Sequence, residues 1–96
     1  MLIRPKSRAE VFRTAFQEVV MRDFIEYIAK QLVDNPEAVS LVDEEKEGKI
    51  VFKLKVGEAD VGKIIGRKGR TAQAMRVLLS AVAAKNGKRA ILEVLD

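Results

Sequence analysis

The chain has 96 residues, 48% of them apolar, and a formal net charge of +4 at neutral pH, which is the size and composition of one small domain. Cysteine and histidine are absent, which excludes disulfides and thiolate or imidazole metal sites and removes the most common general base. No apolar run has the length of a membrane span, and no secretory signal is visible. We therefore expect a cytoplasmic protein that needs no metal, cofactor or membrane.

The first segment, residues 1–20, carries a predicted helix. Ser7 and Glu10 have the spacing of a capping box, which satisfies free N–H groups at a helix start. The apolar residues that follow recur every three or four positions and predict a helix over about Arg8–Val20: Phe12, Ala15, Phe16, Val19 and Val20. The segment is either an extension that docks on the domain or on a second subunit, or a product of gene-start choice.

A second helix is predicted over Arg22–Val33, because its apolar residues fall on one helical face. Asn35-Pro36 ends it, since the residue before a proline is driven out of the helical region. The apolar phase runs almost unbroken across Met21, so one long helix is the alternative.

Three strands are predicted from alternation of apolar and polar residues. Ala38–Asp43 is a short candidate, and Glu44–Gly48 is a polar turn after it. Lys49–Val56 alternates clearly, with its lysines on the open face and four residues in the core: Ile50, Phe52, Leu54 and Val56. Arg89–Leu95 closes the chain, with Ala90, Leu92 and Val94 toward the core.

Two further helices are predicted between the second and third strands. Gly57 opens the first of them, and Glu58 and Asp60 lie in its first turn, where the helix dipole favours acids. The other runs over about Arg70–Lys85, ends at Asn86-Gly87 and buries one stripe: Ala72, Met75, Leu79 and Val82. The two acids therefore have a structural explanation and need no catalytic one.

Paired glycines separate these two helices. Gly66 and Gly69 allow positive φ and keep the backbone free of side chains, so a sugar-phosphate can approach main-chain N–H groups. Arg67 and Lys68 add positive charge between them. The helix that follows directs its free N–H groups and positive dipole end at this loop. These features predict a phosphate clamp.

The sequence Ile64-Ile65-Gly66-Arg67-Lys68-Gly69-Arg70 resembles the signature of the KH domain, a binder of single-stranded nucleic acids. Over about Met21 to Leu95 the chain is similar to the family of KH-domain RNA-binding protein A, small bacterial proteins with a single domain. The resemblance implies an α+β fold of type II KH topology, a three-stranded mixed sheet with helices packed on one face. We expect an N-terminal helical extension over 1–20 and the KH domain over 21–96.

The resemblance implies binding of single-stranded RNA, with the clamp holding the backbone of about four nucleotides. Val61, Ile64 and Ile65 would form an apolar floor under the bases, although we expect at least one of the isoleucines to lie in the core. The expected RNA-binding residues are those of the clamp and its flanks: Lys63, Ile65, Gly66, Arg67, Lys68, Gly69, Arg70 and Arg76.

Charge is unevenly distributed along the sequence. Residues 58–96 contain eight Lys and Arg against four Asp and Glu, whereas residues 21–57 contain six against eight. The basic part is therefore built around the clamp, as expected of a nucleic-acid footprint. Lys85, Lys88 and Arg89 are more simply explained as solvated surface charges.

Self-association is a further hypothesis. Val77, Leu78 and Ala81 widen the apolar face of the helix after the clamp, and such a strip often marks a contact. Because weak single sites gain affinity when they are paired, we expect a dimer, either with itself or with a related KH protein. The resemblance implies a larger Jag-type KH protein as that partner. It also implies an RNA chaperone or post-transcriptional regulator with a role in cell elongation and cell-wall homeostasis.

Three alternatives remain open at this point. The first is a protein-interaction module with a vestigial clamp, and the second is a ribosome-associated KH factor. The third is an enzyme, which we disfavour because the pattern G-x-x-x-x-G-K-[ST] of nucleotide-binding loops is absent and no carboxylate pair other than Glu58 and Asp60 lies near the clamp.

Overall fold

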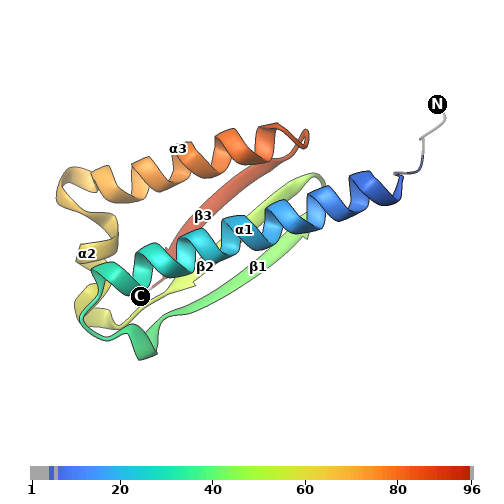
Figure 1. Cartoon of the computed structure of the whole chain (residues 1–96). Coiled ribbons are helices and arrows are strands. Elements are labelled where there is room, and N and C mark those ends of the chain that lie inside the picture. Colours follow the sequence, from blue (N-terminus) through green and yellow to red (C-terminus); the bar gives the residue numbers. More distant parts are fainter. Residues whose placement is uncertain (1–4, 6, 96) are drawn as a thin grey trace.

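The computed structural model describes residue 5 and residues 7–95, except for the side chain of residue 14, so residues 1–4 and 6 of the predicted extension lie outside the described part. Three helices and a three-stranded sheet form two layers (Figure 1). The helices are α1 (Arg8–Leu32), the short α2 (Val61–Ile65) and α3 (Arg70–Ala84). The strands are β1 (Ser40–Lys46), β2 (Lys49–Lys55) and β3 (Arg89–Leu95). This is the predicted α+β architecture.

Helix α1 is continuous, so the predicted break between two N-terminal helices was wrong and the single long helix is correct. Ser7 caps it, since its side-chain oxygen accepts a hydrogen bond from the Glu10 N–H at 3.2 Å. No glycine or proline interrupts residues 8–32, and Met21 at the predicted junction is buried in the core. The helix ends at Val33, whose N–H donates to the Ala29 carbonyl.

The sheet has the order β1-β2-β3, with an antiparallel first pair and a parallel second pair. Strand β1 starts later and runs three residues further than predicted, because a short 3-10 helix, η1 (Pro36–Ala38), precedes it. The turn to β2 consists of Glu47 and Gly48, both at positive φ, which is the pattern of a tight type I′ hairpin. The predicted longer polar turn was therefore wrong.

The core lies between the sheet and the helices and includes Ile50, Phe52 and Leu54 of β2, as predicted, together with Val56 directly after that strand. In α3, Val82 is only half-buried and Ala83 is fully buried, which corrects one position of the predicted stripe. Helices α1 and α3 lie side by side on the same face of the sheet (Figure 1). The main core side chains come from each of the three helices and each of the three strands: Met21, Ile25, Leu41, Phe52, Leu54, Ile64, Met75, Leu79 and Leu92.

The apolar side of the first α1 turns does not pack on the core. Phe12 and Phe16 are 73% and 59% exposed, and their rings stack on each other with centroids 6.4 Å apart. In Figure 1 this part of α1 continues past the end of α3 and the sheet. The helical periodicity was predicted correctly, but the side it presents to the domain is the polar one.

Candidate nucleic-acid interface

The loop between α2 and α3 turns on backbone that only glycine adopts readily. Gly66 ends α2 with φ +79°, and its N–H donates to the Gly62 carbonyl at 2.9 Å. A Cβ at Gly66 would lie 2.2 Å from the Thr71 Oγ1, so no other residue fits without a shift. Gly69 precedes α3 in the left-handed region with φ +73°, and its N–H donates to the Gly66 carbonyl at 3.0 Å. We call Gly66–Gly69 the clamp loop.

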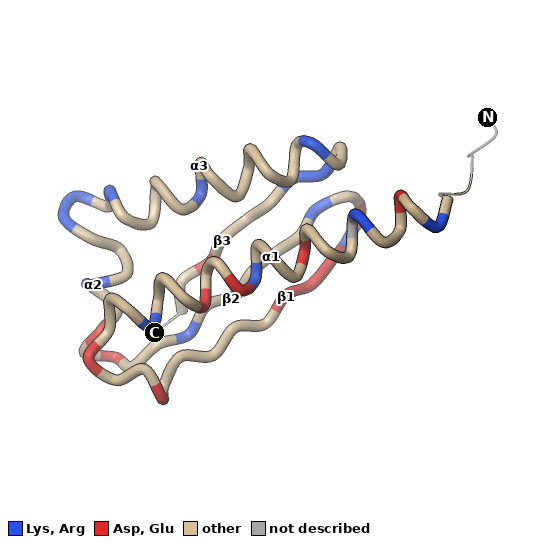
Figure 2. The backbone as a smooth tube through the Cα atoms, in the orientation of Figure 1, with Lys and Arg blue, Asp and Glu red and all other residues tan. Residues whose placement is uncertain are grey.

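Positive charge at the clamp loop is open to solvent. Arg67, Lys68 and Arg70 are exposed, and no described residue gives any of their side chains a hydrogen bond or ion pair. The first turn of α3 contains no acid and no side chain caps it, so its positive dipole end is not neutralised locally. Figure 2 shows Lys and Arg gathered at this turn, while Asp and Glu lie along β1 and near the end of α1. The loop can receive an anion.

Lys63, one of the predicted phosphate contacts, is engaged inside the molecule. Its ammonium pairs with Asp34 and, at 3.2 Å, with Asp60. The hydrogen bond to Asp34, followed by that to Asp60, raises the pKa of Lys63 although burial opposes the shift. Its charge is therefore already compensated, in contrast to those of the clamp loop.

Arg76 belongs to α3, and its side chain reaches the edge strand β3 of the sheet. Its Nε donates to the Leu92 carbonyl of β3 at 3.3 Å, while the residue as a whole stays exposed. Because β3 is an edge strand, this contact sets Arg76 beside the open side of the sheet. The five basic residues among the predicted contacts thus fall into three open cations, one paired lysine and one arginine that bridges to β3.

Asp60 has a structural role that the sequence did not reveal. It belongs to the 3-10 helix η2 (Glu58–Asp60) and is buried at 3% exposure. Its carboxylate accepts the backbone N–H groups of Asp34 and Asn35, both at 3.1 Å, and the Asp34 bond is the main cause that lowers the pKa of Asp60. The predicted dipole role was incomplete, because Asp60 ties the end of α1 to the start of α2. Periodicity contains no signal for such a contact.

The apolar floor is divided between core and surface. Ile64 is fully buried in the core, as we expected of at least one isoleucine, whereas Ile65 is 40% exposed next to the clamp loop. Val61 is half-buried. Ile65 is therefore the apolar side chain most available to a ligand here.

Aromatic side chains are absent from α2, the clamp loop and α3. The five Phe and Tyr residues all lie on α1 and β2, so α2, the clamp loop and α3 offer no stacking platform. Among the described residues, no group of three or more acids is arranged to hold a metal ion. Within that same part of the chain, no helix combines the length and apolar character needed to cross a membrane.

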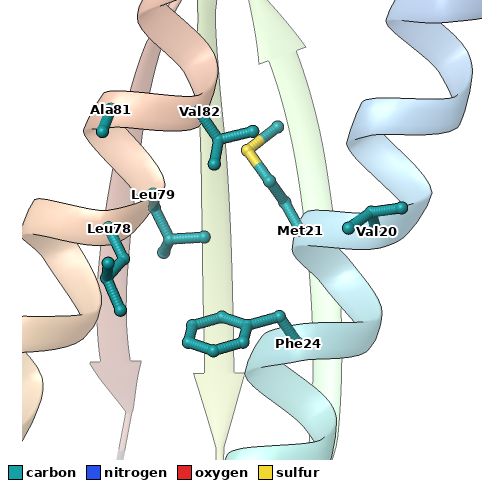
Figure 3. Close-up of a pocket in the computed structure, with 7 residues that line it drawn as sticks. All are labelled: Val20, Met21, Phe24, Leu78, Leu79, Ala81 and Val82. Carbon is teal, nitrogen blue, oxygen red and sulfur yellow. The ribbon is translucent and has the colours of Figure 1, made fainter.

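The residues predicted for self-association lie on the outer side of α3. Val77 and Leu78 are 57% and 53% exposed, and Ala81 is exposed as well. Leu78 and Ala81 also line a groove between α1 and α3, whose other walls come from both helices (Figure 3): Val20, Met21, Phe24, Leu79 and Val82. Val77 is outside that groove.

Comparison with known proteins matches residues 22–94 to a family model described as KhpA/KhpB, KH domain. The chain is similar to RNA-binding protein KhpA of Aquifex aeolicus, at 43% identity over 76 residues, 79% of this chain and 96% of that protein. It is 50% identical to the protein of that name from Borreliella burgdorferi over 74 residues, 77% of this chain and 90% of the relative. The corresponding Listeria monocytogenes protein is 42% identical over 76 residues, 79% of this chain and all of the relative. Residues 1–21 precede the family match.

Proposed function

Because the chain belongs to the KhpA/KhpB family of KH-domain proteins, we propose that it binds single-stranded RNA and holds the RNA backbone on the clamp loop. The observation that carries the proposal is the clamp loop itself. Gly66 leaves no room for a side chain, and the backbone is bare where an α-helix starts beside three cations that have no partner among the described residues. Main-chain N–H groups and these cations suit phosphate, and relatives named for RNA binding support RNA as the ligand.

The proposed contacts divide by chemistry. Arg67, Lys68 and Arg70 contact phosphates, and Ile65 packs against bases from the α2 side. Arg76 contacts the RNA from the side of β3, where its Nε donates to the Leu92 carbonyl. Because no aromatic ring is present for stacking, binding is dominated by the RNA backbone and has modest sequence preference. Three or four phosphate contacts correspond to a salt slope of about −2 to −3 in log affinity against log salt.

In the cell, we propose a cytoplasmic RNA chaperone or post-transcriptional regulator rather than an enzyme. Support for this role, and for a link to cell elongation and cell-wall homeostasis, comes from family resemblance. A weak single site gains affinity when two copies bind one RNA, which favours a dimer, either of this chain or with a Jag-type KH protein. We propose Val77, Leu78 and Ala81 as part of the contact, since they are exposed on α3.

The test reverses two charges in the clamp loop. We expect Arg67→Asp/Lys68→Asp to weaken binding of a single-stranded oligoribonucleotide roughly 100-fold at low salt, since two phosphate contacts become repulsions. The matched control is Lys85→Asp/Arg89→Asp, which changes net charge equally at two exposed positions away from the loop. Equal losses in both variants would mean that only overall charge matters. Unchanged binding in the loop variant would refute the clamp assignment.

A further inference from the structure

The first turns of α1 present an apolar side to solvent because their polar side is fixed to the domain. Asn86, in the turn after α3, donates a hydrogen bond to Gln17. Lys88 pairs with Glu18 at 3.1 Å and also with Glu45 of β1, and its side chain is only 11% exposed. These contacts set the rotation of α1 about its axis. The opposite side of the helix therefore points outward.

That outward side is a continuous apolar ridge, which we define as Phe12, Phe16 and Val20. These residues are spaced by four, so they lie along one side of the helix. They are 73%, 59% and 45% exposed, and Val11 and Val19 beside them are also half exposed. Together these five side chains expose roughly 500 Å², about the largest apolar patch found on a typical monomer. An exposed apolar patch of this size commonly marks an interaction site.

The ridge leads directly into the groove between α1 and α3. Val20 belongs to both, and Phe24, one four-residue step further, lies in the groove and points toward α3 (Figure 3). All seven groove residues are apolar. The groove has a volume of about 280 Å³, which is below the usual range of small-molecule pockets but sufficient for a few side chains. It is a receptor for apolar side chains.

The ridge cannot fill the groove of its own chain. Phe12 and Phe24 lie on one uninterrupted helix, about 18 Å apart along its axis at 1.5 Å per residue. A second copy can bring the two surfaces together. We propose that the ridge of one copy occupies the groove of a second copy, in a two-fold pair with antiparallel α1 helices.

The spacing fixes the register of this pair. With the two-fold axis near residue 18, Phe12 meets Phe24 of the second copy, and Phe16 meets Val20 of the second copy. Each copy gives one ridge and receives one, so the contact closes on itself and does not propagate into a filament. Ridges and grooves together cover roughly 1,200 Å², the lower end of specific interfaces. The area is consistent with a dimer that dissociates on dilution.

This inference deepens the proposed self-association by naming what fills the Leu78 side of α3. It does not depend on RNA binding, because the clamp loop lies near the opposite end of α1 (Figure 1). Residues 8–20 precede the family match at 22–94, and the Listeria relative is matched along its whole length over 76 residues. The ridge is therefore a feature of this chain beyond the shared domain.

The test is sedimentation equilibrium of the full chain over a concentration series. We expect the wild-type chain to dimerise, and both Phe12→Ser/Phe16→Ser and Leu78→Asp to sediment as monomers. At concentrations low enough for the wild type to be monomeric, both variants should unfold thermally like the wild type, since the altered side chains are exposed. Val42→Ser/Ile91→Ser is the control, because it removes two exposed apolar side chains from the strands. It should dimerise like the wild type.

Mixing the two monomeric variants tests the ridge-in-groove contact directly. The Leu78→Asp chain keeps an intact ridge and the Phe12→Ser/Phe16→Ser chain keeps an intact groove, so the mixture should recover part of the dimer. No recovery, a monomeric wild type, or a dimeric Phe12→Ser/Phe16→Ser variant would each overturn the inference. So would ridge-dependent flotation of a monomeric wild type with anionic lipid vesicles. The RNA affinity of the monomeric variants reports separately on the clamp.

Discussion

Both ends of α1 are attached to the domain by polar contacts, but the side chains exposed near the two ends differ in character. At its C-terminal end, Asp60 and Lys63 are engaged with residues 34 and 35, and the charges left open are the cations of the clamp loop. At its N-terminal end, the pairs to Asn86 and Lys88 hold the helix, and the side left open is apolar. One end suits an anionic chain and the other suits an apolar surface.

This difference shows that internal pairing decides which side chains remain available. Lys63 and Arg70 carry the same charge within one short segment. Lys63 pairs with two acids, whereas no described residue gives the Arg70 side chain an ion pair or hydrogen bond. Glu18 and Phe16 are two positions apart on α1, and the ion pair of Glu18 sends Phe16 outward. Each prediction below breaks one of these arrangements, beginning with the largest expected effect.

Gly66→Ala should be the most damaging single change at the clamp end. The added Cβ meets Thr71 at a distance that no real contact has, and the residue must also keep φ +79°. We expect a loss of about 3 kcal/mol or more in unfolding free energy, measured by urea denaturation. Gly69→Ala is the matched control, since its φ is +73° but its Cβ would meet nothing within 4 Å. It should cost about 1–2 kcal/mol. Equal costs would mean that the Thr71 contact relaxes freely.

Asp60→Asn should loosen the link between α1 and α2. The amide has one acceptor oxygen in place of two, so one backbone N–H of the turn loses its partner and Lys63 loses a charge. We expect a lower melting temperature and a weaker dependence of stability on acid pH. The folded-state pKa of Asp60 is lowered, so its stabilisation is present above the unfolded value near 3.9 and is lost as pH falls through the folded one. The difference in melting temperature between the wild type and Asp60→Asn should therefore shrink as the pH is lowered from neutral into the acid range.

Lys63→Met and Arg70→Met should separate a paired cation from an open one. Arg70→Met should reduce the salt slope of RNA binding by about 0.7, the value of one phosphate contact to a single strand. Lys63→Met should leave the slope unchanged, because Asp34 and Asp60 already compensate its charge. Oligoribonucleotide titrations at several salt concentrations measure both. A reduced slope for Lys63→Met would show that Lys63 leaves its acids to contact RNA.

Local patterns predicted most of the fold. Alternation in residues 49–56 identified the strand and its buried side, since β2 packs one face on the helices and leaves the other open. The glycine pair predicted the clamp loop because Gly66 and Gly69 hold two of its three positive-φ positions, with Lys68 at the third. In both cases the cause lies within a few residues, so the sequence contains it.

The errors about the roles of charged side chains concern contacts between distant segments. Asp60 finds its partners about 25 residues away, and Lys88 finds Glu18 70 residues away. Helical spacing located the apolar side of residues 8–20, but it could not indicate that these polar pairs turn this side outward. The same limit applies to Lys88, which we interpreted as a solvated surface charge and which is largely buried between two acids.

Lys88→Met is the smallest predicted effect and examines the other end of α1. Methionine keeps most of the side-chain length but removes both ion pairs, so the helix start loses part of its attachment to the turn before β3. Because the acids remain partly exposed, the loss in global stability should be no more than about 1 kcal/mol. Hydrogen exchange should nevertheless speed up in residues 8–18, since that part of α1 has few other contacts. RNA affinity of the isolated monomer should not change, because the clamp loop lies near the other end of the helix. If exchange there stays as slow as in the wild type, the attachment does not depend on Lys88, and the orientation of the ridge must have another cause.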